Sequence, residues 1–350
     1  MRAARRGLHL LRRLARRKST FAKYSGHLLL AFYFIATTSR DAALRRQALA
    51  AGRERARSWK RQWYRKRRRL DAVMVMDEIC ASYAAAQVGI PHRRIRRDLE
   101  AAAARYSPRE LLGFDPRSGA IPRNVPDDCE CGADNEPGRR RCRKCRRLLT
   151  RRSRYEVWYY ALINIYFCER FGLALKVGYV DVISLLPTLR PYPRPGSRYY
   201  RDAIYAVTHI VYTLNDYNRA RLPPPLLRRE RAFLKASMAW AIKRGDADTV
   251  AEIVDSLAGC GVDDADVQMV NGRAFILEQQ REDGGWGDED HEYGRFHSVW
   301  TCIDGLRDYA WRGRARRYLL GMTGPSFTVR SKNSSMRRQA SRSTMSRRKK

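Results

Sequence analysis

The chain has 350 residues, room for one large domain or two ordinary ones, and is 44% hydrophobic with 19 Tyr, 10 Phe and 7 Trp. This apolar content supports a buried core and excludes a chain that is disordered throughout, while 23 Gly and 14 Pro are too few for a collagen-like sequence. The formal net charge of +35 would suggest a nucleic-acid-binding protein if the charge were evenly spread.

The positive charge is concentrated at the two ends of the chain. Residues 1–70 hold 22 Lys and Arg against 2 acids, and residues 325–350 hold 9 against none. The residues between these ends carry a formal charge of only +6. The basic residues comprise 60 Arg and 11 Lys, a skew that GC-rich coding also produces, so solvated helix faces are the alternative to a nucleic-acid or anionic-membrane surface at the basic termini.

The N-terminal region bears on the cellular compartment. Residues 1–19 form a basic segment, and no acid precedes Asp41, which resembles the transit peptide of a mitochondrial or plastid protein. The longest uncharged run, 24–39, has 16 residues, fewer than the ~20 needed to cross a bilayer, and is typical of a buried helix. We predict a cytoplasmic protein, with an organelle as the alternative.

Hydrophobic periodicity predicts an all-α protein, without the alternating pattern of strands. The expected helices span 6–18, 25–38, 40–66, 70–88, 92–106, 153–173, 178–187, 200–218, 228–243, 246–260, 264–281 and 296–313. The stretch 107–152 interrupts this series with Pro, Gly and Cys residues. Residues 325–350 lack hydrophobic periodicity and are predicted to form a disordered basic tail.

Four of the eight cysteines predict a zinc site. They form the pairs Cys129-x-Cys131 and Cys142-x-x-Cys145, and a short polar loop separates the pairs. Four thiolates at this spacing can surround one tetrahedral structural Zn²⁺, with two disulfides as the alternative. The stretch 107–152 is therefore predicted to be a zinc-knuckle insertion between helices. The remaining cysteines lie singly in apolar segments, where a Cys is usually a small buried hydrophobe.

An octapeptide pattern occurs twice, 88 residues apart. Residues 209–216 and 297–304 both fit His-x-Val-aromatic-Thr-x-x-Asp. An offset of this size accommodates two helical hairpins, so repeated hairpins are predicted.

Within residues 272–287, an aromatic and an aliphatic residue are followed by Gln280 and then by Gly284-Gly285-Trp286-Gly287. This stretch resembles the QW repeat of squalene-cyclase-like terpenoid cyclases, and also the corresponding turns of protein prenyltransferase β subunits. The resemblance implies an α/α toroid over 20–324, in which helical hairpins form an inner and an outer ring. It also implies that Gln280 caps a helix end and that Trp286 stacks on it, which ties neighbouring hairpins together.

The functional residues of those families carry over poorly. The Asp-x-Asp-Asp proton donor of the cyclases would need an Asp at Gly261, so Asp263, Asp264 and Asp266 are better interpreted as caps of the following helix. A prenyltransferase-type zinc site would need an Asp-x-Cys, and the Cys available for it, Cys129, already belongs to the knuckle. The resemblance therefore predicts a fold more firmly than it predicts a reaction.

The repeated octapeptide supplies the candidate site residues. Positions i, i+4 and i+7 share one helix face, and inner helices of a toroid would point such a face at the central cavity. The catalytic candidates are His209, Asp216, His297 and Asp304, and the ligand-binding candidates are Tyr212, Thr213, Trp300 and Thr301. A structural role is the alternative, in which Thr and Asp bond to neighbouring helices and His caps exposed amides.

Together these features predict a terpene-cyclase-like toroid that binds an apolar or isoprenoid-type small molecule in its central cavity, and they do not establish that it is an enzyme. The alternative is a non-catalytic scaffold whose zinc module and basic termini bind a protein or RNA partner. An open cavity lined by His209, His297 and aromatic side chains would favour the first hypothesis. A cavity filled by bulky side chains would favour the second.

Overall fold

The computed structural model describes residues 1–65, 70–123, 125–126, 140–149, 151–287 and 291–312. The protein is all-α, with thirteen α-helices and two short 3₁₀ segments in the described part of the chain. The only strands in this part are the two-residue β1 (Val125–Pro126) and β2 (Arg151–Arg152), which pair antiparallel. None of the described helices is both long and apolar enough to cross a membrane.

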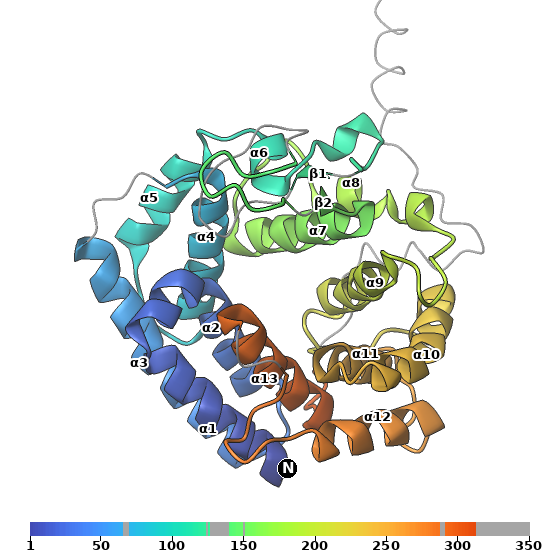
Figure 1. The fold of residues 1–350 in the computed structure, drawn as a ribbon. Helices are drawn as coiled ribbons and strands as arrows, with labels where there is room; N and C mark the ends of the chain where they lie inside the picture. Colours follow the sequence, from blue (N-terminus) through green and yellow to red (C-terminus); the bar gives the residue numbers. More distant parts are fainter. Residues whose placement is uncertain (66–69, 124, 127–139, 150, 288–290, 313–350) are drawn as a thin grey trace, which may run out of the picture.

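Six helices pack against one another in chain order, and the last of them returns to the first (Figure 1). These inner helices are α2 (Lys18–Thr38), α4 (Ala72–Gln87), α7 (Arg154–Phe171), α9 (Tyr200–Leu214), α11 (Ala247–Gly259) and α13 (Glu292–Leu306). They are apolar on average, as expected of helices that are covered on several sides. In α11 all thirteen residues are buried.

The remaining long helices lie outside this ring (Figure 1). They are α1 (Arg2–Arg16), α3 (Ala42–Arg65), α5 (Arg93–Ala103), α10 (Arg228–Lys243) and α12 (Val267–Glu278), with the short α6 (Pro108–Leu112) and α8 (Tyr179–Ile183) between α5 and α9. In α1, α3, α5 and α10 the hydrophobic residues lie on one face and exposed arginines on the other, as expected of helices covered on one side, whereas α12 exposes Val267, Val270 and Leu277.

Local sequence signals set the helix ends. Asp71 and Ser153 accept hydrogen bonds from the backbone N–H groups of Met74 and Glu156 and so cap the starts of α4 and α7. Gly172 ends α7 in the left-handed conformation. The twelve predicted helices are all observed in the same order, with bounds that differ by a few residues, and the short α6 is an additional helix that the sequence analysis did not predict.

Residues 1–19, predicted to precede the helical domain, are part of its packing. Helix α1 buries Leu8, Leu11 and Leu14 and packs against α13 and α2. Its arginines lie on the opposite face. The predicted tail 325–350 lies outside the described residues.

Candidate functional site

The inner helices surround a cavity of about 740 Å³. All six of them contribute side chains to its wall, and tyrosine is the commonest residue type there. The aromatic rings of the wall are those of Phe34, Tyr159, Tyr160, Phe167, Tyr205, Tyr212, Tyr217, Tyr293 and Trp300. A cavity of this size with an aromatic lining and a few polar groups is typical of a small-molecule site.

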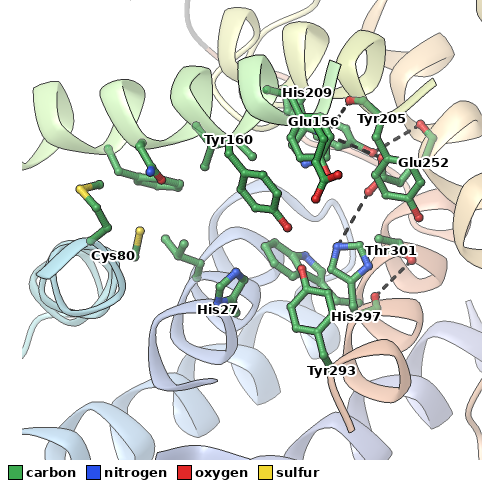
Figure 2. A pocket seen from close by; sticks show the side chains of 18 of the residues that line it. His27, Cys80, Glu156, Tyr160, Tyr205, His209, Glu252, Tyr293, His297 and Thr301 are labelled. Carbon is green, nitrogen blue, oxygen red and sulfur yellow. Dashed lines mark hydrogen bonds and ion pairs between the residues drawn. The ribbon is translucent and has the colours of Figure 1, made fainter. Parts of the chain in front are cut away.

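The cavity has two different sides (Figure 2). The side that we call the apolar wall is formed by Leu30, Phe34, Met76, Cys80, Ile163 and Phe167, from α2, α4 and α7. The side that we call the polar wall consists of the cavity-facing residues of α9, α11 and α13. In Figure 2, Cys80 lies at one end of the cavity, and Glu252 and His297 lie at the other.

Helix α11 supplies the centre of the polar wall. Asp248, Glu252 and Asp255 are spaced i, i+4 and i+7, and all three carboxyl groups face the cavity from a fully buried helix. Sequence reasoning missed these residues. The signal was present, because three acids on one face of an otherwise apolar segment without Lys or Arg are costly to bury unless they have a function or a partner.

Asp248 holds His297 in a fixed orientation. The Nδ1 atom of His297 donates to Oδ1 of Asp248 at 2.9 Å, and the hydroxyls of Thr301 (2.6 Å) and Tyr205 also donate to this carboxylate. Burial lowers the pKa of His297, but the Asp248 carboxylate outweighs burial and raises it to about 8. Burial also opposes ionisation of Asp248, yet His297 and the two hydroxyls hold its pKa below the usual range. The two residues form a buried ion pair at neutral pH.

Glu252 lies beside this pair without a hydrogen bond to either residue. Its Oε1 is 3.9 Å from Nε2 of His297, too far for a hydrogen bond, and the Thr208 hydroxyl donates to Oε2. Burial and the neighbouring Asp248 carboxylate raise the pKa of Glu252 to about 8. Glu252 is therefore largely protonated at neutral pH, and a protonated carboxyl group in a cavity can act as a general acid.

A second pair of carboxyl groups lies further along the same helices. Asp255 accepts hydrogen bonds from the Asn218 amide (2.8 Å) and the Tyr309 hydroxyl, and Asp304 pairs with the buried Arg307 at 2.6 Å. Burial and the charge of Asp304 raise the pKa of Asp255 to about 7. Helices α11 and α13 thus contribute four carboxyl groups to the polar wall, in two layers.

His209 faces the cavity in a different state from His297. Its Nδ1 donates to the Tyr205 carbonyl of its own helix at 2.7 Å, and its ring stacks on Tyr159 with centroids 4.9 Å apart. Burial lowers the pKa of His209 to about 4. The imidazole is therefore neutral at physiological pH and can accept a hydrogen bond or a proton from a bound molecule only weakly.

The two copies of the repeated octapeptide are used unequally. In α13 the residues His297, Trp300, Thr301 and Asp304 all line the cavity. In α9 the cavity-lining members of the octapeptide are His209 and Tyr212.

Thr213 and Asp216 lie outside the cavity wall. The Thr213 hydroxyl meets Tyr179 at 2.7 Å, and Asp216 pairs with Arg170 at 2.7 Å. The predicted helix 200–218 ends at Leu214, and Asp216 has φ +59°, so its side chain leaves the face that it would occupy in a continuous helix.

The Gly-rich turn after α12 joins the two ends of the ring. The Trp286 indole is fully buried and donates from Nε1 to the Ile276 carbonyl at 2.7 Å, which satisfies a carbonyl in the last turn of α12. The Gln280 amide donates to the carbonyls of Ala3 (2.9 Å) and Gly284 (3.0 Å). Gly7 of α1 lies so close to the Trp286 ring that an added Cβ would be only 2.7 Å from it. The turn therefore fastens α12 and α13 to the first helix.

Two of the three acids before α12 accept hydrogen bonds from backbone N–H groups, and the third, Asp264, pairs with Arg273 at 2.8 Å. Asp266 accepts from the Gln268 N–H, and Asp263 accepts from the Ala265 N–H. Asp263 and Asp264 are exposed, and none of these acids lines the cavity. The position of Asp266 at the helix start agrees with the capping interpretation, whereas Asp263 bonds within the preceding turn and Asp264 bonds to a side chain.

Half of the predicted cysteine site can be described. Cys142 and Cys145 lie in a tight turn in which the Lys144 N–H donates to Sγ of Cys142 at 3.4 Å and the Arg146 N–H donates to the Cys142 carbonyl at 3.1 Å. The flanking residues Arg141 and Leu148 form an antiparallel bridge. Cys129 and Cys131 lie outside the described residues. No group of three or more His, Cys, Asp or Glu side chains suited to a metal ion is found within the described ranges.

Comparison with known proteins adds one match. Residues 187–298 match the model of a family described as a domain of unknown function (DUF6895). The matched stretch covers about a third of the chain and includes His209, the three acids of α11 and His297. No curated protein matches the chain, and no solved structure does.

Proposed function

We propose that the protein is a terpene-cyclase-like α/α toroid that binds an apolar or isoprenoid-type ligand in its central cavity. The observation that carries this proposal is the cavity itself, enclosed by six helices and lined by nine aromatic rings. The cavity is not plugged by its own side chains, which favours ligand binding over the alternative of a non-catalytic scaffold.

Two features support the toroid. Inner and outer helices alternate along most of the chain, as in a series of hairpins. The turn that resembles a QW repeat connects the last hairpin to α1, and Trp286 and Gln280 both bond across it. The repeat of His209 and His297 at the cavity is a third sign that hairpins of one kind build the ring.

The polar wall supplies groups for acid–base chemistry. Glu252 can donate a proton into a largely apolar cavity, and the Asp248–His297 pair can take one up or stabilise the charge that forms. Because the acids before α12 lie outside the cavity wall, we assign any proton donation to α11. A binding assay tests whether the cavity holds a ligand. A search for product, once the ligand is known, tests whether these groups catalyse a reaction.

Native mass spectrometry of the purified protein, followed by solvent extraction, tests the binding proposal. We expect an apolar molecule to co-purify and to be displaced by isoprenoid alcohols. Ile163→Trp fills the apolar wall and should abolish retention, whereas Val270→Trp, on the exposed face of α12, should have no effect. Equal retention by both variants would show that the ligand is held elsewhere.

We further propose that Cys142 and Cys145 bind a structural Zn²⁺ together with Cys129 and Cys131. The turn supports this, because a backbone N–H that donates to Sγ stabilises a thiolate, the form that binds metal. Purified protein should contain close to one zinc per chain. Cys142→Ser should release it without unfolding the ring, and Cys80→Ser, in the cavity wall, should retain it.

The exposed arginines of α1 and α3 form a basic surface to which an RNA or an anionic membrane could bind. Arg2, Arg5, Arg13 and Arg16 are exposed on α1, and α3 adds further exposed arginines beside it. If this surface binds RNA or an anionic membrane, the affinity should fall steeply with salt concentration. Salt-independent binding would exclude an electrostatic role.

A further inference from the structure

The charge of the cavity wall is opposite to the charge of the chain. The whole sequence has 71 Lys and Arg against 36 Asp and Glu, but the wall has two arginines against eight acids. The arginines are Arg152 and Arg201, and the acids are Asp77, Glu110, Glu156, Asp202, Asp248, Glu252, Asp255 and Asp304. A coding bias toward Arg acts on the whole chain, so it does not account for a wall that is poor in basic side chains.

We propose that the ligand of this cavity is an organic cation: an apolar amine or ammonium compound whose charged group lies between Glu252 and Asp255 and whose hydrocarbon part lies against the apolar wall. The inference rests on the proposed function, because it names the class of ligand for the same cavity. A cavity that is negative at one side and apolar at the other selects a molecule with the complementary arrangement.

Of the four carboxyl groups that α11 and α13 contribute to the polar wall, Glu252 and Asp255 have no cationic partner within hydrogen-bond distance among the described residues. Asp248 is paired with His297 at 2.9 Å, and Asp304 is paired with Arg307 at 2.6 Å. The hydrogen-bond donors to Asp255 are neutral groups, and the nearest cation to Glu252 is 3.9 Å away. A buried carboxylate is stable only with a compensating charge, which is why Glu252 holds a proton when no cation is bound. A bound cation would supply that charge and would shift Glu252 to its carboxylate form.

The aromatic lining and Trp300 also point to a bound molecule. Tyr212 and Tyr217 stack with centroids 5.8 Å apart beside the carboxyl groups, and aromatic faces attract cations. The Trp300 side chain is 9% exposed, and its indole N–H interacts with the Asp304 carboxylate but makes no well-aligned hydrogen bond to any described residue. An oxygen or other acceptor next to the charged group of the ligand would satisfy this donor.

The test compares three probes that share one hydrocarbon chain: octylamine, octanol and octanoate. Isothermal titration calorimetry at pH 7 measures each affinity for the wild-type protein. We expect octylamine to bind about 10- to 100-fold more tightly than octanol, the range that one or two charge-assisted contacts supply, and octanoate to bind more weakly than octanol. This comparison needs no substitution in the protein.

Variants then locate the charged group. Glu252→Gln and Asp255→Asn should each lower the affinity for octylamine by about tenfold and leave that for octanol within about twofold. Asp263→Asn is the matched control, because it neutralises an exposed acid in the turn before α12, outside the cavity. Ile163→Trp should weaken all three probes together.

The outcomes separate the two proposals. If octanol and octylamine bind equally well, or octanoate binds best, the cation inference is wrong and the apolar cavity stands. The inference also fails if Glu252→Gln and Asp255→Asn change the affinities no more than Asp263→Asn does. If none of the probes binds and Ile163→Trp has no effect, the cavity is not an apolar ligand site and the proposed function is wrong as well.

Discussion

Two tryptophans near α13 show how differently the protein uses one side chain in its scaffold and in its cavity. Trp286 is fully buried in the turn that closes the ring, and its indole N–H bonds to the Ile276 carbonyl. Trp300 lines the cavity, and its indole N–H interacts with Asp304 without making a well-aligned hydrogen bond to any residue that the structure describes. The closing turn is complete without a ligand, whereas the polar wall leaves donors and charges that a ligand could satisfy.

The polar groups of the closing turn and those of the polar wall differ in the same way. In the closing turn, the Gln280 amide bonds to backbone carbonyls of two separate segments and fixes their distance. In the polar wall, the Asp248 carboxylate raises the pKa of Glu252, and Asp304 raises that of Asp255. The ring thus holds together charges that would separate in solution, an arrangement characteristic of functional sites.

The largest effect is expected at the closing turn. Trp286→Ala removes a fully buried indole and its hydrogen bond, and should lower the free energy of unfolding by about 3–5 kcal/mol. Trp300→Ala, in the cavity wall, should cost clearly less. Urea unfolding followed by circular dichroism measures both, and a neutral Trp286→Ala would show that the turn has no role in closing the ring.

A smaller loss of stability is expected when the negative charge of Asp248 is removed from the polar wall. Asp248→Asn keeps the shape of the side chain but removes the anion that stabilises the His297 cation, and should cost about 1.5–3 kcal/mol at pH 6. Burial is then opposed only by the more distant Glu252, so the pKa of His297 should fall from about 8. An NMR titration of the imidazole measures this value. If it does not change, the Asp248–His297 pair does not exist in solution.

The pH dependence of stability has a predicted direction. His297 and Glu252 bind protons more tightly in the folded state, with pKa values of about 8 each, than in the unfolded chain. Their contribution to stability is therefore present at low pH and is lost as the pH rises through about 8.

Glu252→Gln isolates one part of this loss. The variant should be more stable than wild type at pH 9 by at least ~1 kcal/mol, since one pKa unit corresponds to about 1.4 kcal/mol, and nearly equal to it at pH 5. Thermal melts across this range provide the measurement. An equal pH profile for variant and wild type would place the titration elsewhere.

The smallest effect is expected at the neutral histidine. His209 donates only to a carbonyl of its own helix and stacks on Tyr159, so His209→Phe should change stability by less than ~1 kcal/mol. His297→Phe should cost more, because it leaves Asp248 as an unpaired buried charge. Strong destabilisation by both variants would mean that the repeated octapeptide is part of the core and does not form a site.

Much of the helical architecture was determined by the sequence alone. Apolar periodicity and capping residues such as Ser153 and Asp266 are local signals, so the helices could be located in order and to within a few residues. The repeated octapeptide also identified four residues of α13 that line the cavity, because a helix face is set by spacing of i, i+4 and i+7. The same rule misplaced Asp216, since the helix ends two residues before it.

Only the tertiary structure decided which polar residues form the site. Asp248, Glu252 and Asp255 share a face of α11, but the sequence does not say that this face meets His297 from a helix nearly 50 residues away. Nor could it predict that His209 and His297, in matching octapeptides, have opposite protonation states. The physical reason is that a pKa depends on burial and on neighbouring charges, and both are determined by which helices the closed ring places side by side.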